Sequence, residues 1–89
     1  MTDAASIVIE ISVIEERFPP YDPEHATPEP MLRRTLTIRT SKASARFEQT
    51  DYGHAGRLNA WEPRGIDASL QSRANELQAI CDALSPLLR

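Results

Sequence analysis

The stretch 31-MLRRTLTIRTSKASARFEQ-49 decides the fold of this 89-residue chain, because apolar residues alternate along two runs on either side of a polar centre. Alternation with a period of two is typical of a half-buried β-strand. If the chain reverses at Ser41–Lys42, directly opposite residues have numbers that sum to 83. Leu36 then faces Phe47, and Ile38 faces Ala45. The stretch therefore predicts a β-hairpin whose apolar match a slip of one residue would destroy.

The turn of this hairpin has two solutions. Ser-Lys is not a favoured two-residue turn sequence, and a four-residue loop at 40–43 preserves the same pairing. The opposite face of the hairpin is polar in either case, and it carries Arg33, Thr35, Thr37, Arg39, Ser44, Arg46 and Glu48.

Residues 6–18, SIVIEISVIEERF, alternate in the same way and are rich in β-branched side chains, so they predict a further strand. Ile7, Ile9, Ile11 and Val13 share its expected inner face. The following stretch, 19–30, holds five of the chain's seven prolines. Because proline has no amide donor, this stretch is expected to be a loop or an extended arm, and both an ordered and a disordered arm remain open.

The last third of the chain predicts a short strand and a helix. Residues 51–56, DYGHAG, predict a turn. Residues 57–62, RLNAWE, predict a fourth strand in which Trp61 faces outward. We expect this strand to end at 63–65, PRG. A helix follows, with Asp67 as its N-cap and Pro86 ending it near Leu84. Its apolar stripe recurs at spacings of four and three, through Leu70, Ala74, Leu77, Cys81 and Leu84.

Together these elements predict a single α+β domain over residues 1–89. It contains a three- or four-stranded antiparallel sheet in the order β-β-β-(β)-α, with the C-terminal helix packed on one face and a proline-rich loop or arm at 19–30. The expected core consists of Ile7, Ile9, Ile11, Val13, Leu36, Ile38, Phe47, Leu58, Leu77, Cys81 and Leu84.

Charge is distributed unevenly along the chain. The net charge is −6 over residues 1–30, +5 over 31–46 and −2 over 47–89, which gives −3 overall. An acidic first third can neutralise the basic hairpin, with Glu10 as its foremost ion-pair candidate, or the two can form separate patches. The overall acidity argues against a nucleic-acid-binding domain, which usually carries a basic footprint.

No motif for catalysis or for a cofactor is present in the sequence. The three glycines match no phosphate-binding loop, and His25 and His54 lack the further ligands that a metal site needs. Cys81 lies on the expected inner face of the helix, where a thiol is inert. We therefore expect no enzyme activity, no cofactor and no metal.

The cysteine content and the N-terminal sequence indicate the expected cellular compartment. The single cysteine cannot form an intrachain disulfide, and the N-terminus has an acid at Asp3 and no basic region of the kind that opens a signal peptide. No apolar run is long enough to span a membrane. These features favour a cytoplasmic protein with no membrane contact.

Binding is therefore the expected activity. Small acidic proteins of bacteria and phages often regulate or inhibit larger protein machines, and by this analogy we expect a non-enzymatic domain that binds another protein. The alternative is a nucleic-acid-binding module that uses the basic hairpin face 33–46. A homodimer, through an exposed strand edge or through Val8 and Ile14 of strand 6–18, is a further possibility. The candidate contact residues are Tyr21, Arg33, Arg39, Arg46 and Trp61.

Overall fold

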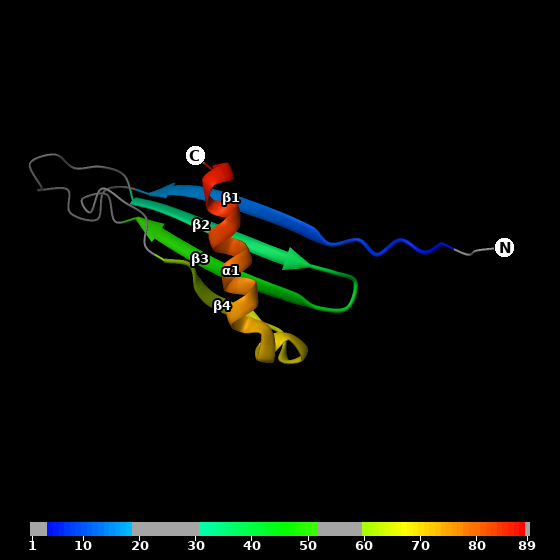
Figure 1. The fold of residues 1–89 in the computed structure, drawn as a ribbon. Coiled ribbons are helices and arrows are strands. Elements are labelled where there is room, and N and C mark those ends of the chain that lie inside the picture. The colour runs from blue at the N-terminus through cyan, green and yellow to red at the C-terminus, as the bar shows by residue number, and fades with distance from the viewer. Residues whose placement is uncertain (1–3, 19–30, 52–59, 89) are drawn as a thin grey trace, which may run out of the picture.

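The computed structural model describes residues 4–18, 31–51 and 60–88. Four strands form one antiparallel sheet in the order β1-β2-β3-β4, and a helical segment follows them (Figure 1). This is the predicted α+β fold. The strands are β1 (Glu10–Phe18), β2 (Met31–Arg39), β3 (Ser44–Asp51) and β4 (Glu62–Ile66), and the helices are η1 (Ala68–Arg73), α1 (Ala74–Leu84) and η2 (Ser85–Leu88).

The predicted hairpin is formed by β2 and β3. Leu36 faces Phe47 and Ile38 faces Ala45, and every pair between these two strands sums to 83 as expected. The chain reverses through the four-residue loop 40–43, in which the amide of Thr40 donates to the carbonyl of Ala43 at 2.9 Å. The four-residue solution to the turn is therefore the correct one.

The core lies between the helical segment and the middle of the sheet. The helix runs across the strands on one face, from the side of β4 towards β1 (Figure 1). The buried apolar side chains come from the hairpin, from the residue before β4 and from the helix: Leu36, Ile38, Ala45, Phe47, Trp61 and Cys81. Partly buried apolar residues complete it: Val13, Ile66, Leu70, Leu77, Leu84 and Leu88.

Part of the expected core is exposed. Strand β1 begins at Glu10, and the side chains of Ile7, Ile9 and Ile11 are 86%, 62% and 47% exposed. A crossing helix about 10 Å wide covers only about three residues of each strand, at a rise of about 3.3 Å per residue. Residues 4–9 also run on past the end of β2 at Arg39. The prediction that these isoleucines are buried is therefore wrong, while Leu58 lies outside the described residues.

The fourth strand lies later in the chain than predicted, at Glu62–Ile66 rather than 57–62. Pro63 is tolerated because β4 is an edge strand, where a missing amide donor removes no bond to a further strand. A register shift at Arg46 and Phe47 places Arg46 opposite Gly65 and Phe47 opposite Pro63. The prediction that 63–65 ends the strand is wrong, because this irregular pairing accommodates all three residues.

The helix begins differently from the prediction. Asp67 precedes the first turn, but its carboxylate accepts a hydrogen bond from the amide of Ser44 at 2.8 Å and caps no helical amide. The first turns are 3-10 helix, with the amide of Leu70 donating to the carbonyl of Asp67 at 2.8 Å. The α-helix ends at Leu84, as Pro86 predicts, and a 3-10 turn follows.

Candidate functional site: the first strand and its exposed edge

Two of the predicted contact residues, Arg33 and Arg39, lie on the open face of the sheet and form ion pairs. The carboxylate of Glu10 accepts from Arg39 at 2.7 Å, and the carboxylate of Glu16 accepts from Arg33 at 3.1 Å. Both acids come from β1, directly opposite their partners on β2. The acidic first strand therefore pairs with two of the three arginines on this face of the hairpin, as the charge distribution allows.

A third arginine of the hairpin is buried. Arg34 lies on the helix side, with 9% of its side chain exposed, and it donates to the Glu15 carboxylate at 3.0 Å and to the carbonyl of Leu88 at 3.2 Å. These two bonds join β1, β2 and the end of the helical segment. Arg34 is therefore occupied within the fold and presents no charge to a partner.

Arg46 and Lys42 differ from the other basic residues of the hairpin. Both are exposed, and neither forms an ion pair with any residue that the structure describes. Arg46 borders a shallow hollow of about 370 Å³ together with Thr37, Ser44 and Asp67. Of the predicted basic contact residues, Arg46 is thus the one that is exposed and unpaired.

Trp61 is buried, with 1% of its side chain exposed. Its indole N–H donates to the hydroxyl of Ser85 at 2.6 Å, and its carbonyl accepts from the side chain of Gln78 at 2.6 Å. The residue therefore attaches the chain before β4 to the helix. The prediction that Trp61 faces outward is wrong, and its ring is unavailable at the surface.

The remaining candidate, Tyr21, lies outside the described residues, as do the proline-rich stretch 19–30 and both histidines.

Most of the exposed large apolar residues in the described part of the chain lie along the first strand. Five of its seven exposed large apolar residues occur within eight positions, and the other two, Ile80 and Leu87, lie in the helical segment. They are Ile7, Val8, Ile9, Ile11 and Ile14. The alternation of 6–18 identified them as strand residues, but only Val8 and Ile14 were expected to be left over from the core.

The outer edge of β1 accompanies this apolar surface. In the order β1-β2-β3-β4, strand β1 pairs on one side only among the described residues, so within this part of the chain its other side presents amides and carbonyls without a strand partner. Residues 4–9 continue β1 without a strand partner in the described part of the chain and extend beyond the hairpin loop (Figure 1). We refer to residues 4–18 as the β1 segment.

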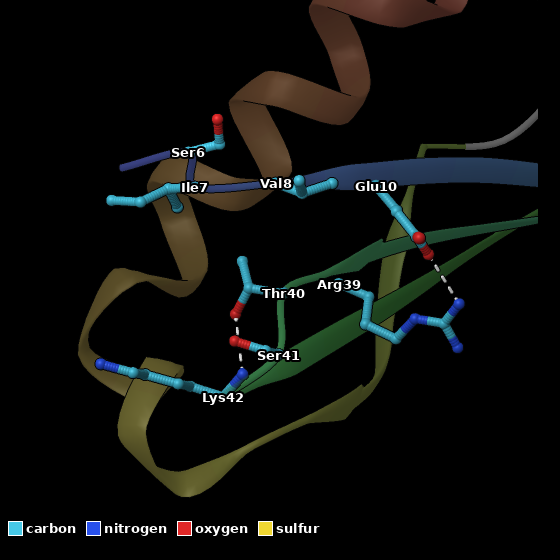
Figure 2. A pocket seen from close by; sticks show the side chains of 8 residues that line it. All are labelled: Ser6, Ile7, Val8, Glu10, Arg39, Thr40, Ser41 and Lys42. Atoms are coloured by element: carbon cyan, nitrogen blue, oxygen red, sulfur yellow. Dashed lines mark hydrogen bonds and ion pairs between the residues drawn. The ribbon is translucent and has the colours of Figure 1, made fainter. Parts of the chain in front are cut away.

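A groove separates the start of the β1 segment from the hairpin loop. It has a volume of about 570 Å³. Apolar side chains of Ile7 and Val8 form one wall, and the Glu10–Arg39 ion pair closes one end (Figure 2). The loop 40–42 forms the other wall, where the hydroxyl of Thr40 accepts from the amide of Lys42 at 3.2 Å. The inner side of residues 6–8 is thus also open to a ligand.

The described residues offer little for catalysis or metal binding. They contain no group of three His, Cys, Asp or Glu side chains that could hold a metal ion. Burial, with a further contribution from Asp82, raises the pKa of the Cys81 thiol to about 11, so the thiol stays protonated at neutral pH. Within the same residues, no helix has the length and apolar character to cross a membrane.

Comparison of the chain with protein-family models, curated proteins and solved structures finds no match.

Proposed function

We propose that this chain is a small protein-binding domain that receives an extended segment of a partner along the outer edge of β1. One observation carries the proposal: five large apolar side chains are exposed on the same segment that presents an unpaired strand edge. An apolar surface that is continuous with an open edge is a typical site for strand addition.

At such a site the main chain supplies most of the affinity, and the side chains supply the specificity. Main-chain amides and carbonyls of β1 would bond to the partner's backbone, which any extended segment can supply. Side chains alternate between the two faces of the sheet, so Ile9 and Ile11 would contact the partner on the helix side and Val8 and Ile14 on the open side. A matching partner therefore has apolar residues at alternate positions on both faces.

A domain of this kind acts by binding a segment of its partner and catalyses no reaction. Strand addition to a larger protein would block or hold in place the segment that it captures. This is the way in which we envisage the chain as a regulator or inhibitor of a larger protein assembly.

Site-specific photo-crosslinking tests the proposal directly. A photoreactive amino acid in place of Ile9 should give covalent protein adducts in the cells from which the chain comes, because Ile9 lies within the contact surface. The same amino acid in place of Ile80, an exposed apolar residue on α1, serves as the control and should give few. Equal labelling from both positions, or none from Ile9, would contradict the proposal.

A second function has its own support. Arg46 and Lys42 remain exposed without an ion pair among the described residues, and a phosphate backbone binds such side chains. We rank this nucleic-acid-binding function below protein binding, because Glu10 and Glu16 neutralise the neighbouring Arg39 and Arg33.

A further inference from the structure

We infer that the segment received by the β1 edge is the β1 segment of a second copy, paired antiparallel about a two-fold axis at Ile11. The inference rests on the proposed function, because it names the occupant of that same edge. It follows from two features of residues 4–18: the order of their apolar residues and the position of their acids.

The position of the two-fold axis determines which residues face each other. In a two-fold antiparallel pair, the residue on the axis faces its own copy, and every other residue faces the one equally distant on the other side. With Ile11 on the axis, paired numbers sum to 22, so residue 4 faces residue 18. Residues 4–9, which have no strand partner among the described residues, then face residues 13–18 of the second copy.

The apolar side chains match in this register. Ile9 faces Val13 and Ile11 faces Ile11 on the helix side of the sheet, while Val8 faces Ile14 on the open side. Each pair off the axis occurs twice in the symmetric pair of strands. Ile7 faces Glu15 and is the one mixed pair among the exposed apolar residues. Cross-strand apolar pairs of this kind stabilise a sheet.

The acids also favour this register. No carboxylate faces another, because Glu10 lies opposite Ser12 and Glu16 opposite Ser6. An axis at Glu10 would place the two Glu10 side chains against each other, and an axis at Val13 would place Glu10 against Glu16. Like charges directly opposite one another destabilise a strand pair.

A two-fold axis at Ser12 is the remaining alternative close to Ile11. It would place Val8 against Glu16, Ile9 against Glu15 and Ile14 against Glu10, so three apolar side chains would face carboxylates in each copy. The register at Ile11 avoids these three mismatches.

The helices do not obstruct the pairing. The carbonyl of Leu88 bonds to Arg34, which faces Glu15 across β1 and β2. Glu15 is four residues from Ile11, so the end of the helical segment lies about 13 Å from the axis along the strand. The two copies therefore carry their helices on one face of the joined sheet but on opposite sides of the axis.

Sedimentation equilibrium tests the dimer. The expected species has twice the 10.0 kDa mass of the chain. Ile11→Lys brings two ammonium groups together on the axis and should raise the dissociation constant of the dimer by more than about tenfold. Because Ile11 is exposed in the single chain, this substitution should not unfold the monomer. Ile80→Lys adds the same charge on α1 and should leave the constant unchanged. Circular dichroism verifies that both variants fold.

Cysteine crosslinking tests the register. Residues directly opposite each other have Cα atoms about 4.5–5.5 Å apart, within reach of a disulfide. Ile11→Cys should therefore crosslink to itself under mild oxidation. Ile14→Cys and Val8→Cys should each fail alone but crosslink when the two variants are mixed. The native Cys81 is buried and should not contribute.

The outcomes separate this inference from the proposed function. A monomer at all concentrations up to about 1 mM overturns the dimer. If residue 9 then still photo-crosslinks to a different protein, the β1 edge remains a protein-binding site and only its occupant is wrong. A dimer that survives Ile11→Lys and shows no Ile11→Cys disulfide also overturns the inference, because the contact then lies elsewhere.

Discussion

The carboxylate of Glu10 accepts a hydrogen bond of 2.7 Å from the guanidinium of Arg39, across the pairing of β1 with β2. Glu16 and Arg33 repeat this arrangement six residues further along β1. Exposed pairs of this kind add little stability, about 0–1 kcal/mol each. Their larger effect is on the electrostatic field of the open face, because each places a negative charge beside an arginine that could otherwise contact an anion.

We expect the chain to show no micromolar binding to DNA or RNA at about 50 mM salt, where phosphate contacts are strongest. Replacement of both Glu10 and Glu16 by glutamine should raise the affinity for duplex DNA at least about tenfold, because it frees Arg39 and Arg33 to join Arg46. Fluorescence anisotropy with labelled duplex and single strands measures both.

The control for this experiment has the same net charge. Glu76→Gln together with Asp82→Asn removes two acids from the helix and should not raise the affinity. Micromolar binding by the unchanged chain that disappears in an Arg33, Arg39 and Arg46 triple alanine variant would promote nucleic-acid binding to the leading function.

Phe47→Ala should lower the free energy of unfolding by about 3–5 kcal/mol, because the ring is fully buried between the sheet and the helix. Urea denaturation measures the loss. Arg46→Ala, on the neighbouring exposed position of β3, should change stability by no more than about 0.5 kcal/mol. Similar effects of the two substitutions would mean that the helix packs on the other face of the sheet.

Trp61→Phe should destabilise the domain by about 1–3 kcal/mol, because it removes the indole donor to Ser85 and reduces the buried volume. Circular dichroism follows the unfolding, since this variant lacks the only tryptophan. In a double-mutant cycle with Ser85→Ala, the two losses should couple. Full additivity would show that the bond contributes nothing to stability.

Glu15→Gln should destabilise the domain by about 1.5–3 kcal/mol, because the buried Arg34 loses its charged acceptor. The adjacent substitution Glu16→Gln affects an exposed ion pair and should cost less than about 1 kcal/mol. Thermal or urea unfolding of the two variants compares them, and the reverse order of their effects would contradict the burial of Arg34.

Stability should fall in the alkaline range through Cys81. The folded pKa of about 11 exceeds the unfolded value of 9.0, so the unfolded chain loses the thiol proton first. The contribution is complete below pH 9 and is lost as the pH rises through 11, by roughly 3 kcal/mol in total. The difference in unfolding free energy between the native chain and Cys81→Ala should shrink over this range, and a constant difference would contradict it.

The hairpin register could be predicted because two adjacent strands supply a complete internal check. Leu36 and Phe47 meet on one face only if every neighbouring pair also matches, and a period of two leaves no intermediate solution. The pairing of Glu10 with the hairpin arginines could be anticipated from charge alone. These features depend on local sequence and on one turn.

The errors arose where the answer depended on distant parts of the chain. Trp61 precedes β4, whose position depends on the irregular pairing at Arg46 and Phe47 and on Ser85 in the helix. The exposure of Ile7, Ile9 and Ile11 depends on where the helix crosses the sheet, and alternation in the strand carries no information about that. Alternation alone therefore predicts burial for these three isoleucines, which the structure exposes.

The strand order of the sheet repeats the order of the strands along the chain. The cost in chain entropy of joining two strands grows with the length of the connection, so the hairpin closed by residues 40–43 has the smallest barrier and should form first. The connection between β1 and β2 is twelve residues long, 19–30, so their pairing has a larger cost in chain entropy. The helix packs against only a few residues of β1, so little apolar burial offsets this cost. We therefore expect β1 to join the sheet after the hairpin has formed, so the edge that we propose for binding does not exist while the hairpin stands alone.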